Sequence, residues 1–219
     1  MISSIKQQVE SLLLESGAVL LPEDCYTNMK YPKVLPIMRF RVDQYGVQDF
    51  GHVMLMHTTT KMGMELITMS FMPSECVNLP YLLVDAMSMK KKRCVFVEYY
   101  GCGMSGLEDG AMKAVYDDYC GLPEYEEKDN WYIKERMPYS LIKTGETDEL
   151  VKMAADSVRA YLGSVGNAVS VPEYYDKLKE FRERMIVQGN PSSKTLNMLL
   201  KEDGARKFME TVIMPLEEK

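Results

Sequence analysis

Hydrophobic and polar residues follow three successive patterns along this chain, and the first is helical. Apolar side chains recur at helical spacing from Ile5 to Leu13, in a segment that Ser3 or Ser4 is expected to cap and Gly17 to end. Three prolines interrupt residues 20–36, which are predicted to form an extended connector. The chain is therefore expected to open with an amphipathic helix followed by a segment without regular structure.

The second pattern is the alternation of apolar and polar side chains that is typical of β-strands. Residues 37–42 alternate apolar side chains with arginines, as a half-buried strand does. A turn is expected at residues 45–46 and a hairpin turn at residues 61–63. Strands are predicted at residues 37–42, 50–60, 64–72, 81–87 and 94–100. Because their connections are short, neighbouring strands are predicted to be antiparallel.

The third pattern is helical again and fills the second half of the chain. Thr147 is expected to cap a strong helix over residues 148–162, because two carboxylates follow it in the first turn. A last strand is predicted at residues 140–143. The other predicted helical segments are residues 107–119, 131–137, 172–186, 205–214 and one that begins at Ser192 or Ser193 and runs through Leu200. This order of elements predicts one α+β domain over residues 1–219 with helices packed on a sheet.

Composition and charge narrow the classes of function. The net charge of −6 and the pI of about 5.1 argue against nucleic acid as the main partner. No basic-then-apolar leader and no apolar run long enough to cross a bilayer is seen, so a cytoplasmic protein without membrane contact is expected. His52 and His57 are the only histidines. Five cysteines stand far apart without a C-x-x-C pair: Cys25, Cys76, Cys94, Cys102 and Cys120. Reduced thiols are expected, and neither a disulfide framework nor a metal site.

One acidic residue and the methionines carry the candidate chemistry. Asp85 is embedded in the apolar sequence L-L-V-D-A-M. It is either an exposed or structurally bonded residue, or a buried carboxylate, which is costly unless hydrogen-bonded or protonated. Nineteen methionines are many, and methionine fills irregular cores as well as adaptable apolar pockets. Both alternatives remain open from the residues alone.

Two segments resemble a known family. The first runs from Phe71-Met72-Pro73 to Asn78-Leu79-Pro80-Tyr81-Leu82-Leu83-Val84-Asp85. The second runs from Gln188-Gly189-Asn190-Pro191 through the basic and leucine-containing helix to Ala205-Arg206-Lys207-Phe208-Met209 and on to Met214. In order and spacing, these segments resemble the ferredoxin-dependent bilin reductases, and the similarity spans about residues 39–214.

The resemblance implies a fold and a reaction. The fold would be a three-layer α/β/α sandwich, with a central antiparallel sheet between two layers of helices. An open-chain tetrapyrrole such as biliverdin would lie between the sheet and the C-terminal helices, and electrons would arrive singly from reduced ferredoxin. The enzyme itself would bind no metal or flavin. It would hold and protonate the bilin in a site that excludes water.

The resemblance also implies roles for individual residues. Asp85 falls on the family's proton-donating aspartate, and its apolar neighbours would raise its pKa. Thr68 stands where several members have a histidine paired with that aspartate, and Asn190 is the best match to a second acid or amide on the C-terminal helices. Threonine and asparagine are not proton donors at neutral pH, so Asp85 is the one matched acid. This is compatible with a single two-electron reduction.

Three more residues are candidates for substrate binding. Arg39 and Arg41 would bind the propionates, since arginine suits carboxylates, although an exposed strand face is an equal alternative. His57 would have a role in the pocket as an acid–base group, against the alternative of an ordinary strand residue.

The electron donor and two further functions complete the expectations. Ferredoxins are acidic, so the basic run Lys90, Lys91, Lys92 and Arg93 is a predicted docking patch, or else only a polar turn between strands. Another hypothesis is a tetrapyrrole-binding or carrier protein that has the fold without the chemistry, which Thr68 and Asn190 favour. A third is a reductase of a chlorophyll-derived linear tetrapyrrole.

Overall fold

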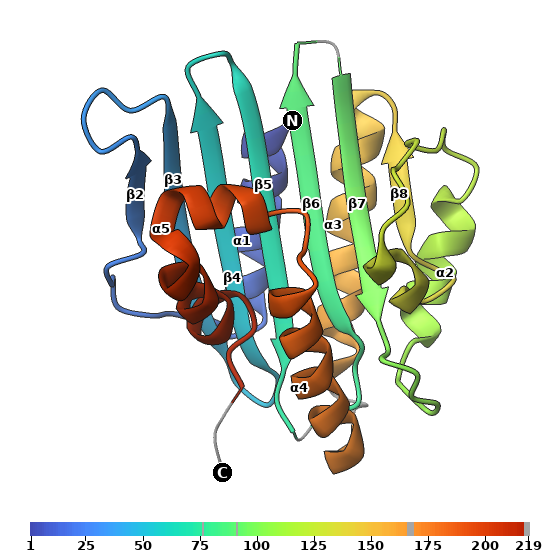
Figure 1. Ribbon diagram of the computed structural model, residues 1–219. Helices are drawn as coiled ribbons and strands as arrows, with labels where there is room; N and C mark the ends of the chain where they lie inside the picture. Colours follow the sequence, from blue (N-terminus) through green and yellow to red (C-terminus); the bar gives the residue numbers. More distant parts are fainter. Residues whose placement is uncertain (76, 91, 166–168, 217–219) are drawn as a thin grey trace.

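The chain folds into a three-layer sandwich (Figure 1). Its computed structural model describes residues 1–75, 77–90, 92–165 and 169–216. Within these residues eight strands make one antiparallel sheet, in the order β1-β3-β4-β5-β6-β7-β8, with β2 also paired to β3. The strands are β1 (Val19–Leu20), β2 (Asn28–Tyr31), β3 (Met38–Val47), β4 (Gly51–Thr60), β5 (Met64–Pro73), β6 (Tyr81–Met89), β7 (Lys92–Tyr100) and β8 (Leu141–Thr144). The sheet is a meander from β3 to β7, as the short connections predict.

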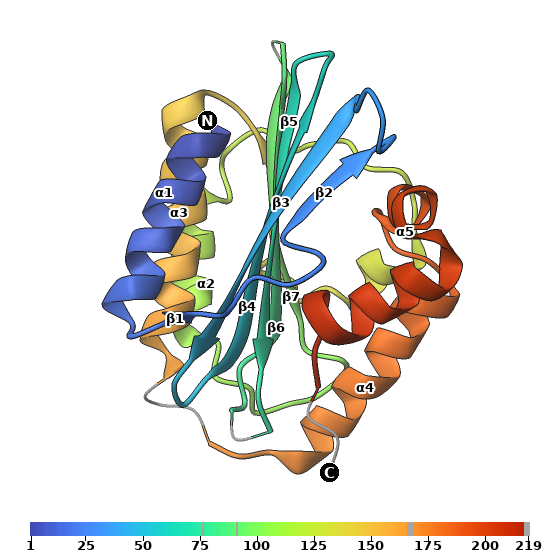
Figure 2. The same ribbon diagram turned by 90° about the vertical axis from the view of Figure 1, so that its left-hand side faces the viewer.

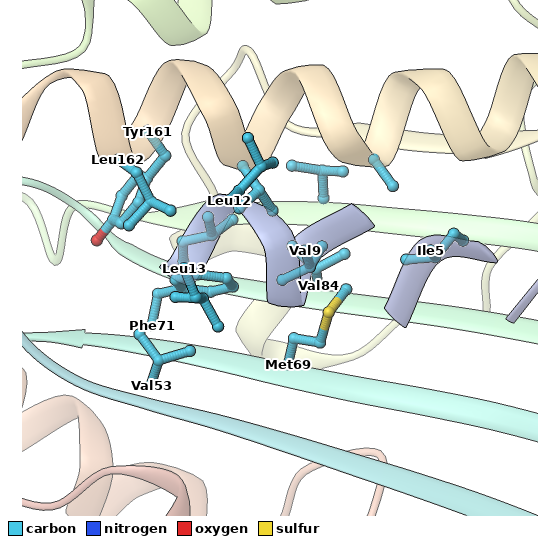
Figure 3. Packing of buried hydrophobic residues seen from close by; sticks show 14 of the residues in the cluster. Ile5, Val9, Leu12, Leu13, Val53, Met69, Phe71, Val84, Tyr161 and Leu162 are labelled. Atoms are coloured by element: carbon cyan, nitrogen blue, oxygen red, sulfur yellow. The ribbon is translucent and has the colours of Figure 1, made fainter. Parts of the chain in front are cut away.

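One face of the sheet is covered by helices α1 (Ile2–Glu15), α2 (Gly110–Tyr119) and α3 (Thr147–Gly163) (Figure 2). Their apolar faces pack on side chains of β4, β5, β6 and β7, and many of these residues have no exposed surface. Figure 3 shows Leu13 of α1 and Tyr161 of α3 above Phe71 and Val84 of the sheet. The rings of Phe71 and Tyr161 meet edge to face, with centroids 5.8 Å apart. This layer is a closely packed apolar core.

The other face carries the C-terminal helices α4 (Pro172–Val187) and α5 (Ser193–Phe208) and the π-helical turn η3 (Met209–Ile213) (Figures 1 and 2). A second apolar cluster joins them to the sheet and also includes Tyr132, from the short 3₁₀ helix η1 (Trp131–Glu135). Lys201 has φ 62° and ψ 174°, so α5 is kinked there. The predicted α+β class and three-layer sandwich are confirmed.

Most predicted elements appear in the structure, with local corrections. Residues 45–46 do not turn, because β3 continues to Val47 with Tyr45 buried in the core, and the bend follows it. The connector over residues 20–36 contains β2 at the sheet edge. Thr147 is not the cap of α3: the helix is preceded by Glu146 as its N-cap residue, and no side chain caps it. Ser192 precedes α5 without a side-chain cap hydrogen bond.

Strand β6 shows how the sheet separates its two sides. Consecutive side chains point to opposite faces, so Val84 lies in the core under α1 and α3 while Asp85 faces the C-terminal helices. Asp85 pairs with Thr68 of β5 and Phe96 of β7 in the ladder. The carboxylate that interrupts an apolar run is therefore directed to one side of the sheet. None of the helices in the described residues has the length and apolar character that a membrane crossing requires.

Candidate functional site

A cavity of about 330 Å³ lies between the sheet and the start of α5. This volume falls within the range of small-molecule sites. Its apolar wall is formed by Met38, Phe40, Met56, Met64, Leu66, Met87, Phe96 and Leu196. Its polar side chains are Thr58, Asp85, Glu98, Tyr125, Glu127, Tyr132, Arg136, Ser192 and Thr195. The cavity thus has the mixed character of a ligand site, mostly apolar with a few convergent polar groups.

Asp85 lies on the sheet floor of this cavity. Thr68 donates a hydrogen bond from Oγ1 to Asp85 Oδ1 at 2.5 Å. Burial raises the pKa of the Asp85 carboxyl to about 6, although the Thr68 bond and the positive charge of Arg136 both oppose the rise. The side chain is half-buried because one side of it borders the cavity. Asp85 is therefore an acid that is half protonated at about pH 6 and lies beside a space for a ligand.

Thr68, Asp85 and Asn190 come together around a second, smaller space of about 20 Å³. A space of this size has room for one water molecule. The amide of Asn190 is occupied in shaping the loop between α4 and α5: Nδ2 donates to the Met185 carbonyl at 3.2 Å, and Oδ1 accepts from the Ser192 amide at 2.9 Å. The structure thus brings the three candidate catalytic residues together. Their catalytic roles stay predictions.

A second carboxylate, Glu98, lines the cavity from the neighbouring strand β7. Its Oε1 accepts a hydrogen bond from Arg136 Nε at 2.6 Å and one from the Tyr100 hydroxyl at 2.8 Å. Arg136 also forms a two-pronged ion pair with Glu127, at 2.5 Å and 2.9 Å. Arg136 therefore joins the sheet floor to the segment that carries Glu127 on the β7 side of the cavity.

The excess of negative charge in this part of the cavity favours protonation of its carboxyl groups. Burial raises the pKa of Glu98 to about 7, and the negative charge of Asp85 adds to the rise while Arg136 opposes it. Only 2% of Glu98 is exposed. Among the described residues that line the cavity, the guanidinium of Arg136 is the one positive group, against the carboxyl groups of Asp85, Glu98 and Glu127. If all three carboxyl groups were ionised, a negative charge would remain uncompensated in a poorly solvated space. Because of this excess, Asp85 and Glu98 keep their protons to a higher pH than exposed carboxyl groups do.

Thr58 contributes a polar atom without a partner. Its side chain is 2% exposed and lines the cavity, yet its Oγ1 has no hydrogen-bond partner within the described residues. A buried hydroxyl normally has a partner, since leaving it unpaired costs free energy. The orphan hydroxyl is therefore a point at which a ligand with a polar atom gains a hydrogen bond.

Arg39, Arg41 and His57 lie on the opposite face of the sheet from Asp85. They line a separate hollow of about 230 Å³ with β2, because the alternation that directs Phe40 into the cavity directs its neighbours away from it. Arg41 is already paired with Asp43 at 2.8 Å and with Glu23 at 2.9 Å. A ligand that contacts Asp85 through the cavity does not reach these three residues. Their role in substrate binding stays a prediction, and it would require a ligand on the face of the sheet opposite to Asp85.

The basic run from Lys90 to Arg93 follows β6: Lys90 lies in a turn after that strand, and Lys92 and Arg93 begin β7. Lys90 and Lys92 are exposed, and Lys91 lies outside the described residues, as does Cys76. Arg93 is directed toward the α3 side, where its guanidinium lies 3.8 Å from Glu146. Two cavity wall residues lie toward this end of the sheet: Met64 at the start of β5 and Met87 near the end of β6.

Sequence reasoning missed Glu98, Arg136 and Thr58. Glu98 carries the same signal as Asp85, an acid inside an apolar strand (V-F-V-E-Y-Y), and this pattern was sufficient to find it. No sequence signal places Arg136 in the cavity, since it comes from an irregular segment after η1. Within the described residues, no group of three or more histidine, cysteine, aspartate or glutamate side chains is arranged to hold a metal ion.

Comparison with known proteins supports the fold. No known protein family and no curated protein sequence matches the chain. A crystal structure of phytochromobilin synthase from tomato, in complex with biliverdin, matches it with a TM-score of 0.72. The match covers 94% of this chain and 79% of that chain, with 12% sequence identity. The chain therefore has the fold of a bilin reductase, as its sequence resemblance predicts.

Proposed function

We propose that the chain is a bilin reductase-like oxidoreductase that reduces a linear tetrapyrrole, biliverdin or a relative, in the cavity beside Asp85. The position of Asp85 carries the proposal: its carboxyl borders the cavity and has a pKa of about 6, raised by burial. A general acid works best when its pKa lies near the working pH. The shared fold with a biliverdin-bound reductase supports the same ligand class.

The reaction needs two electrons and two protons for each double bond that is reduced. Two molecules of reduced ferredoxin supply the electrons one at a time, and each becomes oxidised. Asp85 gives one proton to the tetrapyrrole and recovers one from water, and the second proton also comes, in the end, from water. The apolar wall, with Met56 and Phe96 on the sheet and Leu196 on α5, packs on the flat conjugated ligand and keeps water from the radical that the first electron produces.

The docking of ferredoxin is proposed at the basic run Lys90, Lys91, Lys92 and Arg93, around the turn that follows β6. Exposed lysines in a protein of net charge −6 provide a local positive surface for an acidic carrier. The turn follows directly from the strand that carries Asp85, so a carrier bound there is close to that end of the sheet.

A carrier that binds the same pigment without reducing it is the second candidate. The observation in its favour is that Asn190 uses its amide within the loop and Thr68 has no titratable proton at neutral pH. In this case Asp85 would only accept hydrogen bonds from the pyrrole nitrogens.

The test is an anaerobic single-turnover reaction of bound biliverdin with reduced ferredoxin, followed by absorbance. Wild type should convert the bound pigment to a new bilin. Asp85→Asn should keep pigment binding and slow the conversion by 10²–10⁴-fold, the usual contribution of a general acid. Conversion by the variant at the wild-type rate would refute the assignment of Asp85.

A matched control for Asp85→Asn removes a carboxyl group that lies near Asp85 in the sheet but on the opposite face. Glu65 lies on β5, where it pairs with Ser88, three residues from Thr68. Glu65→Gln should convert the pigment at the wild-type rate. Binding without conversion by wild type itself would favour the carrier.

A further inference from the structure

We propose that Glu98 is the second proton donor of the cavity, so that Asp85 and Glu98 each supply one of the two protons that a reduction consumes. This inference rests on the proposed function. It assigns a chemical role to a buried acid that the sequence resemblance does not identify and that otherwise serves as the hydrogen-bond partner of Arg136 and Tyr100.

The sheet register places the two acids side by side. Asp85 pairs with Phe96, and Leu83 pairs with Glu98, so Glu98 is the diagonal neighbour of Asp85 on the adjacent strand. Diagonal neighbours on one face are about 7–8 Å apart, a distance that long side chains cross. Both carboxyl groups line the same cavity. A ligand that lies on the sheet floor therefore contacts both acids at once.

The surroundings of Glu98 fix its position and leave it protonatable. Arg136 and the Tyr100 hydroxyl both donate to Oε1, which orients the carboxyl group. Arg136 shares its charge with Glu127, which binds two of its nitrogens. Burial raises the pKa of Glu98 to about 7 in spite of the arginine. The titratable or charged groups around Glu98 are Asp85 on β6, Tyr100 on β7, Tyr132 on η1, Glu127 before it and Arg136 after it.

The balance of the reaction requires a second proton, and Glu98 is placed to supply it. When one double bond is reduced, its π bond is lost and two bonds to hydrogen form, while two reduced ferredoxins are oxidised. The first proton leaves Asp85 and the second leaves Glu98, and each carboxylate then takes a proton from water. The negative charge left on Asp85 raises the proton affinity of Glu98, which keeps the second proton in place until it is needed.

A first experiment needs neither pigment nor donor. Infrared difference spectra of the free protein, recorded across pH, report the carbonyl band of each protonated carboxyl group. Wild type should show a band that is lost near pH 7 and that is absent from Glu98→Gln but present in Glu65→Gln. A Glu98→Gln spectrum identical to that of wild type would show that Glu98 is ionised throughout, and it would overturn the inference.

The second experiment separates proton donation from support of Arg136. Glutamine keeps the length and the acceptor oxygen of Glu98, whereas aspartate keeps the acid and loses the length. A donor role predicts that Glu98→Gln takes the first electron and then stalls as a radical visible by electron paramagnetic resonance, with product formation slowed about 10²-fold. Glu98→Asp should restore part of the rate. A purely structural role predicts the reverse order, with the glutamine variant faster than the aspartate variant.

The two experiments also distinguish this inference from the proposed function. If wild type reduces no bilin, the proposed function fails, while the infrared band still decides whether Glu98 carries a proton at neutral pH. If wild type reduces biliverdin and Glu98→Gln does so at the same rate, the proposed function stands and the role of Glu98 is refuted.

Discussion

The two faces of the sheet differ in how completely they are filled. On the face covered by α1, α2 and α3, residues such as Leu13, Phe71 and Val84 have no exposed surface and pack as one apolar cluster (Figure 3). On the face covered by α4 and α5, the sheet and the helices leave a cavity of about 330 Å³ with Asp85 and Glu98 on its floor. The same strands supply both faces, because their side chains alternate.

This difference separates stability from chemistry. A tightly packed core contributes most of the free energy of folding, since each buried apolar side chain is worth about 1.5–3 kcal/mol. A cavity with buried acids contributes less to the free energy of folding. Its carboxyl groups are tolerated only when they are protonated or ion-paired, because a buried unpaired charge is costly. One side of the sheet can therefore keep the strands in register while the other side holds polar groups in a fixed arrangement for a ligand.

Shortening one side chain on each face should give the largest contrast. Phe71→Ala removes a ring from the filled core, and it should lower the free energy of unfolding by about 3–5 kcal/mol. Met87→Ala removes a half-buried side chain beside existing space, and it should cost about 1 kcal/mol. Urea unfolding measures both. Equal losses would show that the two faces contribute alike.

The buried acids should make stability depend on pH. The pKa of Asp85 is higher in the folded protein, at about 6, than its ordinary value of 3.8, so the folded state binds more protons between these values. The contribution of Asp85 to stability should therefore fall as the pH rises from 4 to 6. Asp85→Asn should remove a share of this loss on the order of 2 kcal/mol.

The comparison that checks this is the free energy of unfolding of wild type and Asp85→Asn at pH 4 and pH 7. The remaining ionisable groups are common to both proteins, so they cancel in the difference. A variant with the same pH dependence as wild type would mean that Asp85 titrates as an exposed carboxylate.

The hydrogen bond from Thr68 should set the upper pH limit of activity. Thr68→Val removes the donor that stabilises the ionised form of Asp85, and a hydrogen bond to a charged group is worth at least about 1.5 kcal/mol. The pKa of Asp85 should rise by about one unit, and the basic limb of the single-turnover pH profile should shift upward by the same amount. An unshifted limb would mean that this bond does not control the proton on Asp85.

Arg39 should give the smallest effect. Because Arg39 lies on the face away from Asp85, Arg39→Ala is expected to change the affinity for biliverdin and for its dimethyl ester by less than about twofold. Absorbance titrations of both pigments measure this. A loss confined to the free acid would instead support the role in propionate binding that the sequence suggested.

The sequence predicts much of the fold because the strands of this sheet are regular. Alternation places Asp85 on one face and its neighbours on the other, and short connections make the meander antiparallel. The turn predicted at residues 45–46 failed because β3 runs through Gly46, where its backbone pairs with His52. From the local sequence alone, a glycine at this position predicts the end of a strand. The pairing of β3 with β4 nevertheless keeps the strand continuous through Gly46.

The site is predictable only in part. Asp85 and Glu98 stand out because an acid in an apolar strand is rare and costly. Arg136 reaches the cavity from an irregular segment, and its position depends on tertiary packing that no local pattern contains. Strand alternation also separates Arg39 and Arg41 from the cavity, and this could be read from the sequence once Phe40 is assigned to the pocket side.

The most direct test of the central claim is an absorbance titration with biliverdin of two neighbouring variants. Thr58 faces the cavity, whereas Thr59 pairs with Arg39 on the other face. Wild type and Thr59→Phe should bind the pigment with a red-shifted spectrum and equal affinity. Thr58→Phe fills the cavity and should lose binding at least 10-fold while its thermal unfolding remains cooperative. Binding by Thr58→Phe as tight as that of wild type would contradict the account and place the ligand elsewhere on the protein.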